Sequence, residues 1–308
     1  PGDVVEVEVD APNAPNAPTT GRLVTTVTQG THAFGDFGNT PKVDDLQRIE
    51  AWGSEDEHAA AVAAGRATPL ETPAAQSPLT DEIRELLDGV AVATVSSALR
   101  KRGYVDIFID GVHPNHEGDR ILGTAKTLRF IPFRPDLFKQ YGGGFNAQKR
   151  AFDSVQPGEV LVVEARGIPT TGTVGDVLAL RAQFRGAAGI VTDGGVRDFA
   201  AVQEFNIPVF SQGAHPSVLG RRHVPWEVDV TIACGGAAVQ PGDIIFGDRD
   251  GVIVIPPFLL EEVARESAKQ EAEDAWVAEQ VAHGAPVDGL FPMNAEWRAR
   301  YEAEQGQA

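Results

Sequence analysis

The sequence is poor in cysteine, which limits how the fold is stabilised and which metals it binds. Among its 308 residues there is a single cysteine, Cys234. One cysteine forms no disulfide within the chain and excludes a zinc site built from several thiolates. Cys234 lies in the apolar, strand-like run 231–234. This setting is typical of a buried, unreactive thiol.

Long hydrophobic runs are absent as well. No stretch of 18 apolar residues occurs, and the sequence therefore predicts no transmembrane helix and no membrane partner. The first residues show no basic segment followed by an apolar stretch, which a secretory signal would require. We therefore expect a cytoplasmic protein.

Positive charge is scarce compared with negative charge. The chain has 26 Lys and Arg residues and 44 Asp and Glu residues, and its formal net charge is -18. This balance argues against nucleic acid and anionic membranes as partners, because both attract basic surfaces. One interpretation is that the acidity serves solubility alone. If the substrate is also acidic, a metal ion or a placed arginine must supply local positive charge.

The composition otherwise resembles that of ordinary globular proteins, with 42% hydrophobic residues, and it changes along the chain in three steps. Residues 1–77 form an N-terminal extension and linker with strand-like runs at 4–9 and 23–28. Residues 78–256 form the core. Residues 257–308 form a helical tail, in which 258–283 reads as one long helix.

The core alternates short apolar runs with helical stretches, which favours an α/β architecture around a largely buried sheet. Thr80 is a good N-cap for its first helix. Further helices are predicted at 92–102, 146–153, 177–185 and 199–205. Strands are predicted at 121–127, 160–164, 189–192, 209–211, 228–233, 244–246 and 252–255.

Charged residues follow two neighbouring strands of this predicted sheet. Asp176 opens a helix after the strand at 160–164, and Arg197 and Asp198 follow the strand at 189–192. Ligands of open α/β sheets bind beyond the carboxyl ends of the strands, so both groups should reach one rim. The alternatives are structural, since Asp176 and Asp198 are also suitable helix caps and Arg197 with Asp198 would form an ordinary surface ion pair.

This set of residue types suits chemistry on a keto acid. Two carboxylates bind a hard divalent cation, and a guanidinium binds a substrate carboxylate in a fixed geometry. The backbone N–H groups at the start of a helix, here 175–178, favour an anion as well. Cleaving a C–C bond beside a keto group leaves an enolate, whose charge a metal ion and an arginine stabilise.

The pattern Gly175-Asp176-Val177-Leu178 followed by Gly194-Gly195-Val196-Arg197-Asp198 resembles the Asp-x20-Arg-Asp signature of the RraA-like family. That family includes class II 4-hydroxy-4-methyl-2-oxoglutarate aldolases, which also decarboxylate oxaloacetate, and the regulator of ribonuclease activity A. The flanking runs 156–163, 241–245 and 248–252 agree with it. The resemblance covers roughly residues 79–256, with a weaker match at 292–301.

The resemblance implies a compact β/β/α sandwich assembled as a homotrimer or homohexamer, with Mg²⁺ or Mn²⁺ as the cofactor. It implies that Asp198 binds the metal directly and that Asp176 holds it through water. Arg197 would bind the substrate and stabilise the enolate. The substrate carboxylate would bind the backbone amides of Gly175, Asp176, Val177 and Leu178.

Relatives often complete the site with an acidic residue from a neighbouring subunit, and Glu271 and Glu273 are candidates by position. The chain departs from many relatives at Ala201, where they carry an acidic residue. The N-terminal extension is additional and faintly resembles the C-terminal strands of fumarylacetoacetate-hydrolase-like proteins. A structural flap, or the remnant of a larger fusion, is the alternative interpretation of this extension.

Three further motifs have modest predicted roles. His113 and His116 are three residues apart, but Pro114 and the loop context favour surface histidines over a metal site. His215 follows a strand and is a minor candidate for substrate contact. The run 142–144 is a flexible glycine loop, because it lacks the pattern of a dinucleotide site.

The predicted function is a divalent-metal-dependent lyase that cleaves a C–C bond of a short 2-keto acid through a pyruvate enolate. The reaction is aldol cleavage, decarboxylation of oxaloacetate, or both. The alternative is a non-catalytic RraA-like regulator that binds a ribonuclease or another protein. Asp176 favours the enzyme, because a regulator has no need of a second carboxylate facing Arg197 and Asp198.

Overall fold

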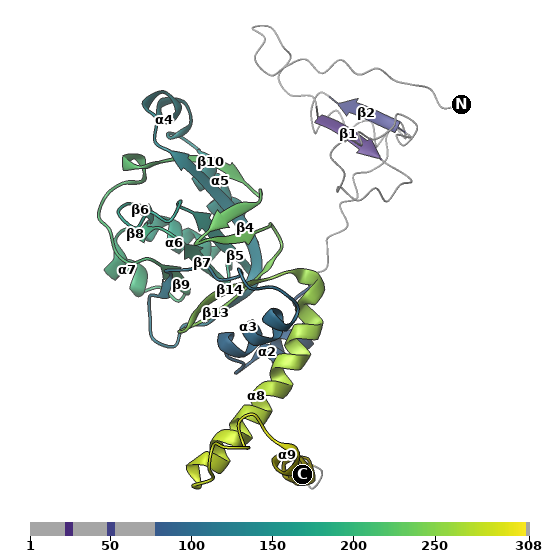
Figure 1. The fold of residues 1–308 in the computed structure, drawn as a ribbon. Helices are drawn as coiled ribbons and strands as arrows, with labels where there is room; N and C mark the ends of the chain where they lie inside the picture. The colour runs from purple at the N-terminus through teal and green to yellow at the C-terminus, as the bar shows by residue number, and fades with distance from the viewer. Residues whose placement is uncertain (1–21, 27–47, 53–77, 306–308) are drawn as a thin grey trace. The chain divides into compact units, whose positions relative to one another are not determined.

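The computed structural model describes residues 22–26, 48–52 and 78–305 (Figure 1). The chain divides into two units, Pro1–Gln76 and Ser77–Ala308. In the first unit, β1 (Arg22–Thr26) pairs antiparallel with β2 (Arg48–Trp52). The strand predicted at 23–28 is therefore present in shortened form. The strand predicted at 4–9 lies outside the described residues.

The second unit is built around a mixed sheet of eight strands in the described part of the chain. The strands are β3 (His113–Pro114), β4 (Ile121–Pro132), β5 (Glu159–Glu164), β7 (Gly189–Thr192), β9 (Val209–Ser211), β10 (His223–Val228), β13 (Ile244–Asp248) and β14 (Gly251–Ile255). Their order is β14-β13-β4-β5-β7-β9-β3, and β10 also pairs with β4. The central strands β4, β5, β7 and β9 run parallel, so their carboxyl ends meet at one edge of the sheet.

Both faces of the central strands are covered, which explains their continuous apolar sequences. Three helices cover one face: α5 (Ala147–Ser154), α6 (Asp176–Phe184) and α7 (Phe199–Gln203). The hairpin of β11 (Ile232–Cys234) and β12 (Ala237–Val239) packs on the other face. Along β5, Leu161 and Val163 pack toward the helices and Val160 and Val162 toward the hairpin. The predicted α/β class and β/β/α sandwich are confirmed.

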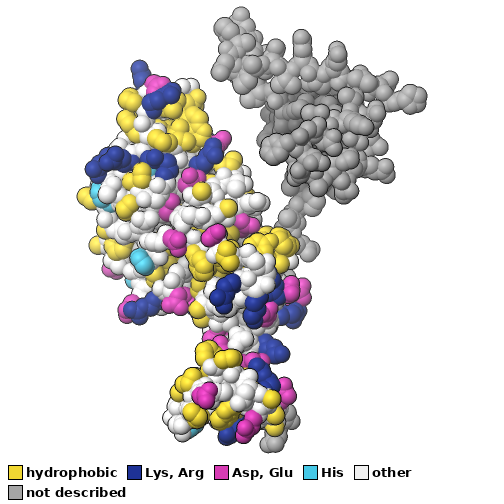
Figure 2. Space-filling view, in the orientation of Figure 1, with side chains coloured by type: hydrophobic (Ala, Val, Ile, Leu, Met, Phe, Trp, Pro, Cys, Tyr) yellow, Lys and Arg dark blue, Asp and Glu magenta, His cyan; other side chains and the backbone are white. Residues whose placement is uncertain are grey.

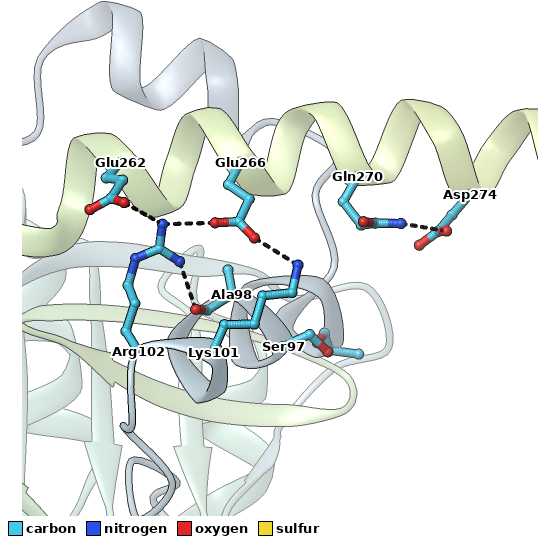
Figure 3. Close-up of polar contacts among 9 residues, drawn as sticks. Ser97, Ala98, Lys101, Arg102, Glu262, Glu266, Gln270 and Asp274 are labelled. Atoms are coloured by element: carbon cyan, nitrogen blue, oxygen red, sulfur yellow. Dashed lines mark hydrogen bonds and ion pairs between the residues drawn. The ribbon is translucent and has the colours of Figure 1, made fainter. Parts of the chain in front are cut away.

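A second layer of helices covers β13 and β14 (Figure 1). It contains α2 (Asp81–Leu87), α3 (Val92–Lys101) and α8 (Leu260–Ala282), the last preceded by a 3-10 turn, Pro257–Leu259. Ion pairs join α8 to the end of α3, as Figure 3 shows. Arg102 Nη2 lies 2.7 Å from carboxylate oxygens of both Glu262 and Glu266, and Lys101 Nζ lies 2.7 Å from Glu266 Oε1. The first half of α8 is therefore part of the core unit.

The end of α8 forms a small cluster of its own with α9 (Ala295–Gln305). The rings of Trp276 and Tyr301 meet edge to face with centroids 5.3 Å apart, and Leu290 of the connecting loop is buried in the same cluster. Arg298 Nη1 pairs with Glu273 Oε1 at 2.7 Å. No described helix is long and apolar enough to span a bilayer.

The strand predicted at 228–233 is wrong in its bounds. The chain leaves the sheet at Asp229, whose φ of 58° is incompatible with a continuous strand, and β11 begins only at Ile232. The buried Lys126 ammonium holds this turn through an ion pair of 3.0 Å with Asp229. Within the described residues, the other predicted strands and helices are present, with ends that differ by a few residues.

Several short elements were not predicted. They are α4 (Pro135–Tyr141), β2, β3, β6 (Gly172–Val174), β8 (Gly195–Val196), β10, β12 and the 3-10 turn Leu219–Arg221. The strand β4 also continues five residues beyond its predicted end. The strands β3, β6, β8 and β12 are only two or three residues long, so period-two alternation gives no usable signal in them.

His223 at the start of β10 is fully buried, with its ring centroid 5.5 Å from that of Phe130. Burial, together with the charges of Arg166 and Arg222, lowers the pKa of His223 from 6.5 to about 4. As the pH falls from 7 to 4.5, the unfolded chain binds a proton that folded His223 does not. We therefore expect the parent to lose about 2 kcal/mol of unfolding free energy from this group.

Urea unfolding at pH 7 and pH 4.5 measures this effect. The variant His223→Gln should show a smaller loss between the two pH values than the parent. His113→Gln, at an exposed histidine, is the matched control and should behave like the parent. Equal pH dependence in His223→Gln and the parent would contradict the assignment.

Candidate functional site

The candidate site begins with three short segments that run side by side beyond the carboxyl ends of β5 and β7. The strands β6 and β8 pair in parallel, and Val196 of β8 also bridges Ala214. Arg197 N–H donates to Val174 O at 2.8 Å, and His215 N–H donates to Val196 O at 2.9 Å. This ladder fixes the backbone of all three segments just before the predicted site residues.

The ladder brings the two halves of the sequence motif together. Val174 is opposite Val196, so Gly175 and Asp176 continue beside Arg197 and Asp198. A methyl carbon placed on Gly175 would lie 3.3 Å from Asp198 Oδ2 and 3.7 Å from Arg197 Cβ. The structure therefore places Gly175 beside Arg197 and Asp198, with Asp176 next along the chain.

The start of α6 provides the backbone groups of the site. Gly175 is its N-cap and has no side chain with which to cap the helix. Asp176 Oδ1 accepts the N–H of Val177 at 2.8 Å, and the side chain of Val177 is 74% exposed. The first turn of α6 is therefore partly exposed near Asp198, and the Asp176 carboxylate already binds one of its amides, as the alternative of a capping aspartate predicts.

Arg197 is held in place by close packing around its aliphatic chain. A methyl carbon on Gly172 would lie 2.0 Å from Arg197 Cγ and 2.9 Å from Ser217 O, so only glycine allows this path. The Nε atom of Arg197 is buried without a hydrogen-bond partner. Within the described residues no carboxylate forms an ion pair with Arg197, which leaves its guanidinium free for an acidic ligand.

Asp198 has an unusual backbone conformation at an exposed position. Its φ of 51° and ψ of 36° are left-handed, and its side chain caps no amide of α7. Such a conformation costs an L-residue about 1 kcal/mol, although aspartate tolerates it better than most. Asp198 is therefore the N-cap of α7 by position, but its carboxylate does not cap the helix and is available to a ligand.

Asp176 and Asp198 are the two carboxylates of this region that could hold a hard divalent cation. Mg²⁺ binds oxygen ligands and commonly takes only one or two carboxylates, with water and substrate completing its shell. Among the described residues no group of three or more His, Cys, Asp or Glu side chains forms an alternative metal site. The donor set therefore suits Mg²⁺ or Mn²⁺ with a chelating substrate and does not suit zinc.

One important residue of this region, Asp193, was not predicted. It is buried after β7, and its carboxylate accepts N–H groups of Ala165, Gly167 and Gly235 at 2.5, 2.7 and 3.2 Å. Burial raises the pKa of Asp193, and these backbone hydrogen bonds oppose the shift. Asp193 thereby joins the loops that follow β5 and β11. An aspartate directly between a buried strand and a glycine pair was the available signal.

The remaining sequence candidates lie as follows. Cys234 is fully buried, and burial raises the pKa of its thiol, which agrees with an unreactive role. His116 Nδ1 lies 3.3 Å from Asp119 Oδ2, and His113 is exposed. His215 lies in the third segment of the ladder, beside Arg197. The glycines 142–144 follow α4 and are not part of this ladder.

Glu271 and Glu273 both have partners within the chain. Glu273 is buried in its ion pair with Arg298. Glu271 Oε2 accepts Ala91 N–H at 3.2 Å and Thr94 Oγ1–H at 2.7 Å, so it caps α3, whose own N-cap Ala91 has no suitable side chain. In this structure each carboxylate therefore has a structural role.

We expect Glu271→Ala to lower the unfolding free energy by about 1 kcal/mol, because it removes a helix cap. Thermal unfolding of the variant and parent measures this change. Glu279→Ala removes an exposed carboxylate from the same helix and should leave the melting temperature unchanged. An unchanged melting temperature with lost turnover in Glu271→Ala would instead point to a role at a neighbouring subunit.

Comparison with known proteins agrees with this architecture. Residues 92–254 match the model of the RraA-like family, described as Aldolase/RraA. A protein of Halalkalibacterium halodurans named "Putative 4-hydroxy-4-methyl-2-oxoglutarate aldolase" is 34% identical over 164 residues, which are 53% of this chain and 72% of that protein. Protein DlpA of Legionella pneumophila is 27% identical, and the match covers 64% of this chain and 31% of DlpA.

Solved structures give the same result. The crystal structure of Streptomyces coelicolor RraAS2, an unusual member of the RNase ES inhibitor RraA protein family, superposes with a TM-score of 0.58. It is 32% identical, and the match covers 67% of this chain and 98% of that one. An uncharacterized protein from Pseudomonas syringae superposes with a TM-score of 0.63 at 25% identity, over 73% of this chain and 100% of that one. The chain belongs to the RraA-like family.

Proposed function

We propose that this protein is a divalent-metal-dependent lyase that cleaves a C–C bond of a short 2-keto acid. The observation that carries the proposal is that Gly175, which precedes Asp176, lies beside Arg197 and Asp198 at the start of α6, where the N-cap has no capping side chain. The aldolase name of the Halalkalibacterium relative supports this class of activity. The substrates we propose are 4-hydroxy-4-methyl-2-oxoglutarate and related aldols, and oxaloacetate.

The family resemblance implies a role for each residue, and the chemistry of each residue is suited to that role. The backbone N–H groups from Gly175 to Leu178 bind the carboxylate next to the keto group. The Arg197 guanidinium donates to that carboxylate or to the keto oxygen, and it stabilises the negative charge that develops there. Asp198 would hold Mg²⁺ or Mn²⁺ directly and Asp176 through water, and the bound ion would polarise the keto group.

The bond change is the same for both kinds of substrate. The bond between the third and fourth carbons breaks, and its electron pair moves into the pyruvate enolate. In aldol cleavage the 4-hydroxyl group gives its proton to solvent water and the fourth carbon leaves as a ketone, whereas in decarboxylation the fourth carbon leaves as carbon dioxide. A proton from water then converts the enolate to pyruvate. Arg197 contributes most where the charge is greatest, at the enolate oxygen.

The direct test is pyruvate release from oxaloacetate and from 4-hydroxy-4-methyl-2-oxoglutarate, followed with lactate dehydrogenase. We expect turnover with added Mg²⁺ or Mn²⁺ and its loss in excess EDTA. Turnover should return when the metal is restored. Oxaloacetate also decays spontaneously with divalent cations, so the metal without protein is the required control. No metal-dependent turnover of either substrate would refute the lyase proposal.

A regulatory function is the second candidate, and it is favoured by the similarity to RraAS2 of the RNase ES inhibitor family. It requires only a surface that binds a ribonuclease or another protein. A catalytically inactive chain that nevertheless inhibits a ribonuclease in an RNA cleavage assay would support this candidate.

We further propose assembly as a homotrimer or homohexamer, which sedimentation equilibrium of the full chain tests.

A further inference from the structure

Beside Arg197 lies a pair of side chains, His215 and Arg221, that the proposed chemistry does not use. His215 follows Ala214, which bridges Val196 in the parallel ladder. This register places His215 level with Arg197 on the adjacent segment. Aligned residues of parallel strands project from the same face, so both side chains lie on the face that carries the site.

Arg221 reaches the same place from the turn before β10. Its Nη1 donates to Thr170 O at 2.9 Å and lies 3.5 Å from His215 Nε2. Gly172, over which Arg197 packs, is two residues beyond Thr170, and its N–H donates to Ser217 O at 3.1 Å. The segment 170–172 therefore contacts both arginine side chains.

The pair presents hydrogen-bond donors on both sides. His215 Nδ1 accepts the N–H of Ser217 at 3.1 Å, so a neutral His215 carries its hydrogen on Nε2. Arg221 Nη1 carries only hydrogens and accepts nothing. Two donor nitrogens 3.5 Å apart face each other with no acceptor between them. An oxyanion bound by both groups would resolve this arrangement, and a carboxylate has the appropriate size.

The charge around the pair also favours an anion. Neither Arg197 nor Arg221 has an ion-pair partner within the described residues, although the whole chain has a net charge of -18. Arg166 adds a further guanidinium nearby, donating to Arg222 O at 2.9 Å. Figure 2 shows Lys and Arg side chains gathered over the loop between β9 and β10. A local basic surface on an acidic protein indicates an acidic ligand.

We propose that His215 and Arg221 bind a second carboxylate of the substrate, at the end remote from the keto group. This inference rests on the proposed function, because it assumes that the first carboxylate binds at the start of α6. The pair would explain why the substrates already proposed, which are 2-keto dicarboxylates, are preferred over 2-keto monocarboxylates. His215 and Arg221 are thus specificity-determining residues.

The test uses two unreactive ligands that differ only in the second carboxylate. They are 2-oxoglutarate and 2-oxopentanoate, which have equal chain lengths and no 4-hydroxyl group for aldol cleavage. Binding to the full chain with saturating Mn²⁺ is measured by calorimetry. We expect the parent to bind 2-oxoglutarate at least about tenfold more tightly, since a charge-assisted pair favours its partner strongly.

In Arg221→Gln and in His215→Asn, the preference for 2-oxoglutarate should fall to less than about threefold, with binding of 2-oxopentanoate unchanged. Arg222→Gln removes the same charge from the adjacent exposed residue and is the matched control. It should keep most of the preference. An equal loss of the preference for 2-oxoglutarate in Arg222→Gln and Arg221→Gln would overturn the proposal, because it would show that only the overall positive charge of this surface matters.

The outcomes separate this inference from the proposed function. Equal binding of both ligands by the parent overturns the second carboxylate site and leaves the lyase proposal standing. A preserved preference for 2-oxoglutarate without any turnover refutes the lyase proposal alone. Failure of the parent to bind either ligand overturns both.

Discussion

Asp198→Asn should reduce metal-dependent turnover by about 10³-fold, because it removes the only charge proposed to bind the metal directly. Asparagine has nearly the same shape and tolerates the left-handed backbone at this position, where φ is 51°. The side chain of Asp198 is exposed and caps no helix amide, so folding should be unaffected. Pyruvate release and Mn²⁺ binding by electron paramagnetic resonance measure the two parts of the effect.

Two comparisons make this prediction specific. Asp250→Asn changes an exposed aspartate in the turn between β13 and β14 and should retain parental activity. Circular dichroism should show the same melting temperature for Asp198→Asn and the parent. Activity within tenfold of the parent in Asp198→Asn would show that the metal, if required, is bound elsewhere.

Gly172→Ala should be almost as damaging, although glycine carries no chemistry of its own. The new methyl group would lie 2.0 Å from Arg197 Cγ, 2.8 Å from its Cδ and 2.9 Å from Ser217 O. Arg197 must therefore leave its present path, and the guanidinium moves away from the rim. We expect kcat/KM to fall about 10²-fold, comparable with the loss of a positioned electrostatic group.

Arg197→Lys tests whether the geometry of the guanidinium matters in addition to its positive charge. Lysine keeps the charge without the planar fork, so a small residual activity should remain, as in Gly172→Ala. Gly143→Ala is the control for glycine replacement, because a methyl carbon there meets no atom within 4 Å. Parental activity in Arg197→Lys would exclude the clamp role of Arg197. Parental activity in Gly172→Ala would mean that Arg197 works equally well from a different path.

Much of the architecture is predictable from the sequence because long apolar elements carry strong signals. The strand β5 and the helix α6 were located by their apolar composition and by glycine at their borders. The meeting of Asp176 with Arg197 and Asp198 follows from a simple rule, that neighbouring parallel strands end at one edge. The location of these residues at one edge of the sheet could therefore be predicted without knowing how side chains pack.

The details that position the site depend on contacts between segments remote in sequence. The role of Gly172 requires knowing that Arg197 folds back across it. The carboxylate of Asp193 joins loops that are 28 and 42 residues away in the chain. Likewise, Glu271 caps α3 from 180 positions away, so no local capping pattern could reveal it. Such pairings follow from the fold and leave no periodic signal.

The arrangement of α8 has a consequence for how the molecule opens. Its first half is held by the core through Leu260 and Val263, whereas its end relies on the small cluster around Trp276 and Tyr301. A cluster this small contributes much less free energy than the sheet and its helices. Amide hydrogens near the end of α8 and in α9 should therefore exchange with deuterium through local opening, long before those of β5 and β7. The same helix thus spans two cooperative units.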